Sequence, residues 1–190
     1  MARSSCRDAL SLVPVLLGIA AICGGSGCSG KDPYRPGESI GAFHVTGKLV
    51  STTCGKTPDP WKFDVRLRHE RNTLYWVQGD APISGQVDPS AKAVLKSSDV
   101  KTVRAADPKS QRAACAMSRA DVLTVVLAPV VAPATDLHGA TSFKGTLTYH
   151  FDATDGSECD DQLEASGGDF AVLPCDVHYD LGGVRSGDAK

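Results

Sequence analysis

Apolar and polar residues alternate at every second position in four segments of the chain. They cover residues 43–49, 61–68, 143–151 and 173–181. In residues 61–68, for example, aromatic and aliphatic side chains at 61, 63, 65 and 67 alternate with charged ones between them. Successive side chains of a strand point to opposite faces, so this period predicts β-strands. One apolar and one wet face per strand is typical of an antiparallel sheet.

Shorter apolar runs separate these four segments and predict further strands at residues 73–78, 83–87, 91–96, 100–104 and 122–127. Turn-forming residues punctuate them, as at Asp88-Pro89-Ser90 and Asp155-Gly156. Residues 108–119 are the one stretch that could hold a short helix. We therefore expect an all-β fold: a single antiparallel β-barrel or barrel-like sandwich with about 8 to 10 strands and at most one short helix.

The first 28 residues have a composition of their own. Arg3 and Arg7 precede an apolar run over residues 9–22, and small residues 24–27 lead to Cys28. This is the layout of a secretory signal peptide. It resembles the bacterial lipoprotein signal, whose leader is cut before a cysteine that receives diacylglycerol, although Gly25 stands where that family usually has Leu. An ordinary secretory signal cut nearby is the alternative. The run is shorter than the ~20 residues of a transmembrane helix.

Cysteine counting agrees with this resemblance. The chain has 7 cysteines, and removal of residues 1–27 leaves five. With Cys28 acylated, the remaining four can form two disulfides, which export to an oxidising compartment permits. If the first and last strands close a barrel, Cys54 pairs with Cys175 and Cys115 with Cys159. The rival set pairs Cys54 with Cys115 and Cys159 with Cys175.

We therefore divide the chain into a signal peptide (1–27), a lipidated cysteine with a flexible tether (28–39) and a β-barrel-like domain (40–190). The 163 residues from Cys28 onward carry 18 basic and 21 acidic side chains. This balance offers no basic surface for nucleic acid or for anionic lipids. The lipid on Cys28 would hold the protein to a membrane. Ser29 follows it, which, by the resemblance to enterobacterial lipoproteins, favours the outer membrane of the cell envelope.

Several polar residues are candidates for chemistry. His44, His150 and His178 occupy the wet faces of predicted strands, where a surface metal site is possible if those strands are neighbours. His69 falls at a strand end and is expected at a rim, and His138 falls in a loop. The acidic residues 152–161 suggest a solvated turn, with calcium binding as the alternative. Residues 37–41 match G-x-S-x-G, but no helix is predicted after them, as a nucleophile elbow requires.

No complete catalytic constellation and no cofactor motif is evident, which favours a binding module over an enzyme. We expect a membrane-anchored binding or scaffolding module that holds a small apolar ligand or an envelope protein. A lipocalin-like carrier, an unrecognised envelope hydrolase and a secreted inhibitor or surface antigen are the alternatives. Large aromatic residues on the apolar faces would either fill the barrel or line a ligand pocket.

Overall fold

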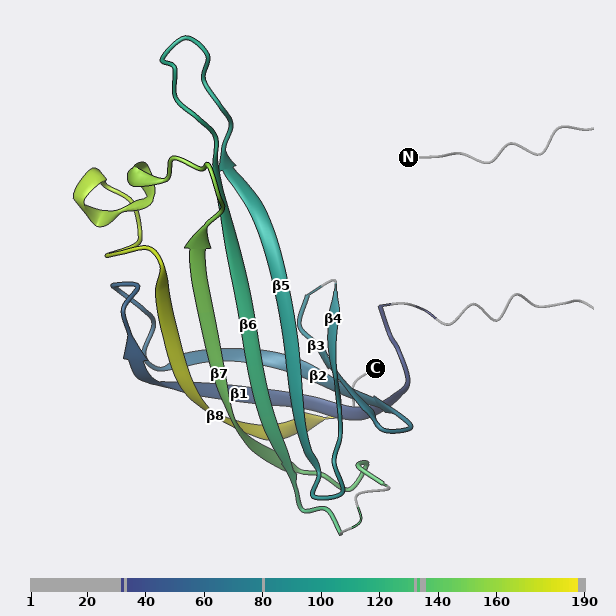
Figure 1. Cartoon of the computed structure of the whole chain (residues 1–190). Coiled ribbons are helices and arrows are strands. Elements are labelled where there is room, and N and C mark those ends of the chain that lie inside the picture. The colour runs from purple at the N-terminus through teal and green to yellow at the C-terminus, as the bar shows by residue number, and fades with distance from the viewer. Residues whose placement is uncertain (1–31, 33, 80, 132, 134–135, 188–190) are drawn as a thin grey trace, which may run out of the picture. The chain divides into compact units, whose positions relative to one another are not determined.

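The computed structural model describes residues 32, 34–79, 81–131, 133 and 136–187. The predicted signal peptide and Cys28 lie outside the described residues. The described chain forms one eight-stranded antiparallel sheet with the order β4-β3-β2-β1-β8-β7-β6-β5 (Figure 1). Its strands are β1 (Glu38–Thr52), β2 (Trp61–Glu70), β3 (Thr73–Val77), β4 (Pro82–Gln86), β5 (Lys92–Arg104), β6 (Cys115–Ala128), β7 (Ser142–Ala153) and β8 (Cys175–Gly187).

The first and last strands form the centre of the sheet. β1 pairs with β2 on one side and with β8 on the other. Two antiparallel meanders, β2-β3-β4 and β8-β7-β6-β5, extend from this pair and curl toward each other. A bridge between Val87 and Ala93 joins their ends, and a Cβ atom on Gly85 would lie 2.2 Å from the carbonyl oxygen of Val94. The sheet is therefore a nearly closed barrel, which confirms the predicted fold class.

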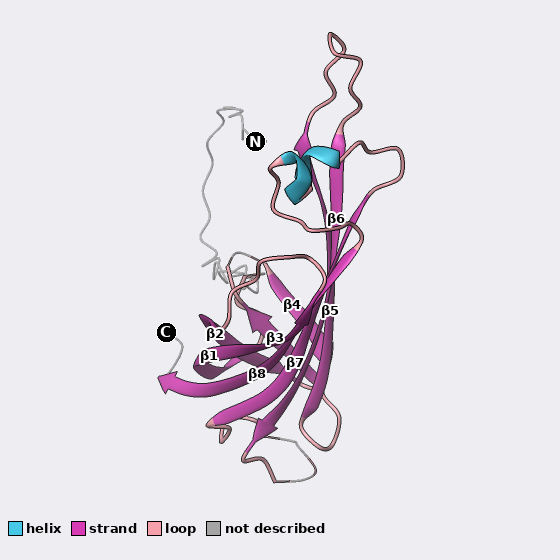
Figure 2. Ribbon diagram, turned by 90° about the vertical axis from the view of Figure 1, so that its left-hand side faces the viewer, coloured by secondary structure: helices cyan, strands magenta, loops and turns pink. Residues whose placement is uncertain are grey.

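Two local predictions were wrong. Residues 108–119 contain no helix, because β6 begins at Cys115, bonded to Cys159, and pairs with both β5 and β7. These tertiary contacts override a weak local preference. The helical turns lie instead at Asp160–Gln162 and Glu164–Ser166, beside the extended β5–β6 hairpin (Figure 2). β5 is one strand where two were predicted, since its alternation continues through Ser97, which donates a hydrogen bond to Asp121.

Aromatic side chains fill the barrel. Phe43 and Phe143 are almost fully buried, with ring centroids 5.6 Å apart, and Trp76 contacts Phe143 at the same distance. Phe143 lies directly over Gly183 of β8, where a Cβ atom would come within 2.0 Å of the ring. Strand alternation thus delivers large rings to the interior, and a glycine on the facing strand leaves room for one of them.

Two disulfides join distant parts of the domain. Cys54, in the loop after β1, is bonded to Cys175 at the start of β8, and Cys115 is bonded to Cys159. These are the pairs preferred from the expected strand order. The first bridge spans 121 residues of sequence and the second 44. Both therefore restrain long loops of the unfolded chain.

The predicted tether is partly ordered on the barrel. β1 begins at Glu38, two residues before the expected domain start, and Arg68 of β2 donates hydrogen bonds to the carbonyl oxygens of Pro36 and Gly37. Within the part of the chain that the structure describes, no helical segment has the length and apolar character needed to cross a bilayer.

Candidate functional site

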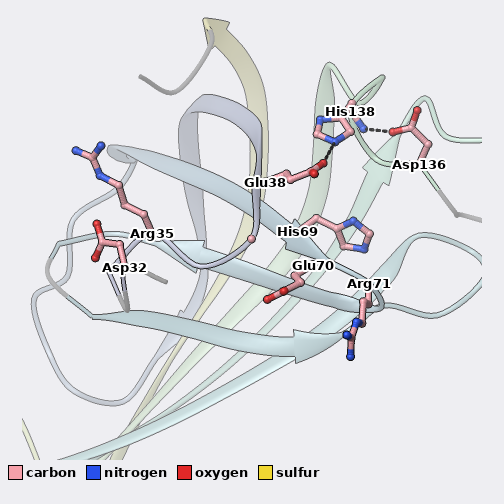
Figure 3. Close-up of a pocket in the computed structure, with 9 residues that line it drawn as sticks. Asp32, Arg35, Glu38, His69, Glu70, Arg71, Asp136 and His138 are labelled. Carbon is pink, nitrogen blue, oxygen red and sulfur yellow. Dashed lines mark hydrogen bonds and ion pairs between the residues drawn. The ribbon is translucent and has the colours of Figure 1, made fainter. Parts of the chain in front are cut away.

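A polar pocket of about 650 Å³ lies where β1 begins (Figure 3). Three segments that are far apart in sequence surround it: residues 32 and 34–38, the end of β2 with the turn after it, and residues 136–138 in the loop before β7. The lining residues are Asp32, Arg35, Gly37, Glu38, His69, Glu70, Arg71, Asp136 and His138. Its volume is within the range of typical ligand sites, roughly 300–1,000 Å³.

Gly37 brings the N-terminal segment close to β2. Its φ angle is +66°, in the left-handed region that glycine adopts without strain. A Cβ atom at this position would lie 2.5 Å from the carbonyl oxygen of His69. Arg68 holds the same segment through its guanidinium, with N···O distances of 2.9 Å to Pro36 and 2.6 Å to Gly37. This wall of the pocket is therefore built into the fold.

The loop before β7 forms the opposite wall. Leu137 is fully buried in the core and anchors this loop. Asp136 accepts a hydrogen bond from the backbone N–H of His138 at 2.8 Å, and the His138 ring lies 3.2 Å from the carboxylate of Glu38 (Figure 3). Arg185 of β8 donates to the His138 carbonyl at 3.0 Å. These contacts hold the loop against β1, β8 and the core.

His69 lies at the end of β2, at the rim position expected from the sequence. Its Nε2 atom is buried and has no hydrogen-bond partner among the described residues. Burial, together with the nearby ring of His138, holds the pKa of His69 below its ordinary value. The imidazole is therefore neutral at pH 7, and an unsatisfied nitrogen lies beside the pocket.

The pocket lining carries charges of both signs. Asp32, Glu38, Glu70 and Asp136 supply four carboxylates, while Arg35 and Arg71 supply two guanidinium groups. Guanidinium groups bind phosphate and carboxylate, and carboxylates accept hydrogen bonds from ammonium groups. A small ligand that carries both charges fits this lining better than an apolar one.

A second cavity, at the barrel mouth and lined by residues of β3 to β7, is much smaller. Its volume is about 120 Å³, below the range of typical ligand sites. Arg119 makes two hydrogen bonds of 2.7 Å to Asp121, and its guanidinium lies 4.3 Å from the ring centroid of Tyr149. Burial raises the pKa of the Tyr149 hydroxyl. Arg119 thus joins Asp121 to the face of the Tyr149 ring and narrows the mouth.

The structure separates the three histidines of the hypothetical metal site. Their strands, β1, β7 and β8, are neighbours, as the hypothesis required. However, His44 lies opposite Val184, whereas His178 lies six residues earlier on β8 and pairs with Thr148. His44 contacts Asp64, and His150 lies 2.8 Å from Asp176. No group of three potential metal ligands occurs among the described residues.

Two of the acidic residues in 152–161 hold their loop against the β5–β6 hairpin. Asp161 forms ion pairs with Arg104 and Arg112, at 2.9 and 3.3 Å, and Glu158 accepts a hydrogen bond from the backbone N–H of Ala113. The G-x-S-x-G string at residues 37–41 leads into β1 and no helix follows it. Neither feature forms a catalytic arrangement.

No protein-family model, no curated protein and no solved structure matches the chain. The fold and the geometry of the polar pocket therefore carry the functional argument. Sequence patterns identified His69 and His138 separately, as a rim residue and a loop residue. Nothing in the sequence indicated that they lie on the same pocket, because only the tertiary fold brings their segments together.

Proposed function

We propose that the chain is an exported lipoprotein, anchored through Cys28, whose barrel is a binding module for a small polar ligand of mixed charge. The leader's resemblance to lipoprotein signals supports the anchor. The two disulfides are typical of proteins from oxidising compartments. The polar pocket supports the binding role. We place the module at the cell envelope and, from Ser29, favour the outer membrane.

The observation that carries this proposal is a ligand-sized pocket with charged groups of both signs on its walls. The guanidinium groups of Arg35 and Arg71 would bind an anionic part of the ligand. Glu38 and Asp136 would bind a cationic part. An apolar carrier would need a dry cavity of comparable volume, whereas aromatic side chains fill the barrel and its mouth holds about 120 Å³.

The position of the pocket along the chain suggests where its ligand comes from. Asp32, on the pocket wall, is four residues after Cys28. Four residues span at most about 14 Å, so a lipid on Cys28 would hold the pocket near the membrane surface. A phosphate joined to an ammonium group, as in a phosphoethanolamine head group, has the chemistry that the pocket favours. The same chemistry occurs in small free zwitterions.

Calorimetric titration tests the binding site. We expect glycerophosphoethanolamine to bind saturably and more tightly than glycerol 3-phosphate, which lacks the ammonium group, or ethanolamine, which lacks the phosphate. Arg71→Gln and Glu38→Gln should each weaken binding about tenfold, the loss of one charge-assisted hydrogen bond. Arg66→Gln, on the exposed face of the same strand as His69, is the control. Equal binding of all three compounds, or none, would refute the assigned ligand class.

Vesicles distinguish the two sources of the ligand. If the ligand is a membrane lipid, Cys28→Ser protein should bind vesicles of mixed phosphatidylethanolamine and phosphatidylcholine but not pure phosphatidylcholine vesicles. If it is a free zwitterion, only the soluble compound should bind. Mass spectrometry of the mature N-terminus tests the anchor independently. We expect an acylated Cys28, and Cys28→Ser should move the protein from the detergent phase to the aqueous phase. An unmodified terminus at another residue would refute the anchor and leave the pocket assignment standing.

A further inference from the structure

Among the described residues, nothing pairs with the outer part of strand β5 on its free edge. β5 pairs with β6 from Lys92 to Arg104, and the sheet order ends at β5. On its other side, the one described bridge is that between Val87 and Ala93, at the base of the strand. β5 and β6 then continue well beyond the end of β4 (Figure 1). Residues 98–103 are all exposed, with Val100 at 61% and Val103 at 41%.

The hydrogen bonds at the base of β5 show which residues face this edge. The carbonyl oxygen of Lys92 accepts a hydrogen bond from Asp88, and that of Val94 lies against Gly85. The even-numbered residues therefore direct their backbone groups toward the β4 side. Since this direction alternates along an antiparallel strand, the N–H and C=O groups of Ser98, Val100 and Thr102 point to the unpaired edge.

The edge has a defined length. The register between β5 and β6 shifts between Thr102 and Arg104, which places a bulge at Val103. Bulges and charged side chains commonly protect sheet edges from uncontrolled pairing. Here the bulge limits regular pairing to residues up to Thr102 and leaves a short segment around Val100.

The sequence of this segment is complementary to itself. When two copies run antiparallel with Val100 opposite Val100, Asp99 of each copy lies opposite Lys101 of the other. Ser98 then lies opposite Thr102. Opposite charges in directly facing positions stabilise a strand pair, and like charges destabilise it. The same register places the outward-directed N–H and C=O groups of residues 98, 100 and 102 opposite those of the other copy. Each facing pair can exchange two hydrogen bonds, which gives about six across the two copies.

We propose that two copies of this chain associate through their β5 edges, antiparallel and centred on Val100. Each copy contributes one short strand segment, so the interface is at the small, transient end of the range for protein pairs. Such a dimer is weak in dilute solution and strengthens with local concentration. Confinement of a lipid-anchored chain to a membrane would supply that concentration. The pairing itself does not depend on the polar pocket.

Charge reversal at the facing positions tests this register. The full chain, solubilised in detergent, is examined by sedimentation velocity over a range of concentrations. We expect Lys101→Asp to weaken dimerisation at least tenfold, because it places two acidic pairs across the interface. Asp99→Lys should act similarly with basic pairs. A mixture of the two variants should form heterodimers, and the double variant D99K/K101D should regain the wild-type dimer.

Lys62→Asp, exposed on β2, is the control for charge reversal away from the edge. Asp99 also lies opposite Arg119 of β6 within the same sheet, so thermal unfolding must accompany the Asp99→Lys measurement. Lys101 lies opposite the uncharged side chain of Met117, so Lys101→Asp disturbs no facing charge within the sheet and is the cleaner variant. A dimer that survives Lys101→Asp, or a mixture of the two variants that stays monomeric, would overturn the proposed register.

Oxidative cross-linking gives a second measurement. Val100→Cys places one thiol on the two-fold axis of the dimer, where facing Cα atoms lie about 5.5 Å apart, a separation that a disulfide can span. Val122→Cys on the neighbouring strand, 39% exposed in the wild type, is the matched control. We expect a cross-linked dimer from the first variant at least tenfold faster than from the second. Equal rates would refute self-association, and so would a wild-type chain that is monomeric at every concentration. These are also the results expected if a strand from another protein, and not a second copy, covers the edge.

Discussion

The contact between Gly183 and Phe143 gives a sharp prediction about packing. Gly183 is buried on β8, and a Cβ atom there would come within 2.0 to 2.6 Å of three ring atoms of Phe143. Phe143 itself is 2% exposed and lies between Phe43 and Trp76. Aromatic neighbours therefore restrict the movement of the ring. Gly183→Ala must therefore displace either the ring or the strand.

The neighbouring Gly182 is a matched control, because a Cβ atom there meets no heavy atom within 4 Å. Overpacking of a core typically costs about 1–3 kcal/mol. Replacing glycine with alanine in a compatible conformation stabilises by about 0.4–1 kcal/mol, through the unfolded state. We therefore expect Gly182→Ala to be neutral or slightly stabilising. Gly183→Ala should have a free energy of unfolding lower than that of Gly182→Ala by about 1–3 kcal/mol.

Urea unfolding of the oxidised protein, followed by the fluorescence of Trp61 and Trp76, measures this difference. In a domain of this size, about 1–3 kcal/mol corresponds to a fall in Tm of roughly 2–12 °C. Combining Gly183→Ala with Phe143→Leu should cost less than the two changes summed, since the smaller side chain relieves the clash. Equal stability of the two alanine variants, or full additivity in the double variant, would refute the packing argument.

Two further predictions concern the disulfides and His69. By the chain-entropy relation, removal of Cys54–Cys175 should lower the free energy of unfolding by about 5 kcal/mol, and removal of Cys115–Cys159 by about 4 kcal/mol. In urea unfolding, the variant with alanine at both positions of the first pair should therefore be the less stable of the two, and the reverse order would contradict the relation. Burial favours the neutral form of His69 in the folded state, so the unfolded state binds more protons as the pH falls below 6.5. The contribution of His69 to the free energy of unfolding should therefore be present at pH 7.5 and should be lost as the pH falls through and below 6.5. His69→Gln should flatten the dependence of the free energy of unfolding on pH between 7.5 and 5.5, whereas an unchanged slope would show that other groups cause it.

The parts of the fold that were predicted correctly are those where side-chain alternation and turn residues agree. Residues 61–68 alternate without interruption, residues 143–151 alternate except at Gly145, and both lie within single strands, β2 and β7. Ser97 broke the apolar pattern of β5, so one strand was predicted as two. The break has a physical cause: Ser97 lies on the inner face where its partner is the carboxylate of Asp121 rather than an apolar side chain.

The polar pocket could not be predicted, because its walls come from segments that only the tertiary fold brings together. Glu38 and His138 are separated by 100 residues, yet their side chains lie 3.2 Å apart. Nothing in the local sequence of either residue encodes that contact. It follows from the pairing of β1 with β2 and from the burial of Leu137, which positions the loop. Alternation indicates which face of a strand is buried, but not which strand ends meet.

The placement of β1 beside β8 sets an order of events for a chain that emerges N-terminus first. β2, β3 and β4 pair with their sequence neighbours, as do β5, β6 and β7, so these two sets of strands can form while synthesis or translocation continues. β1 has to wait for the last strand before its second edge is covered. The thiol of Cys54 waits with it, and Cys115 is available to that thiol 60 residues before Cys175 is. A Cys54–Cys115 bond can therefore form before Cys175 is available, and thiol–disulfide exchange would then have to convert it to the native Cys54–Cys175 bond.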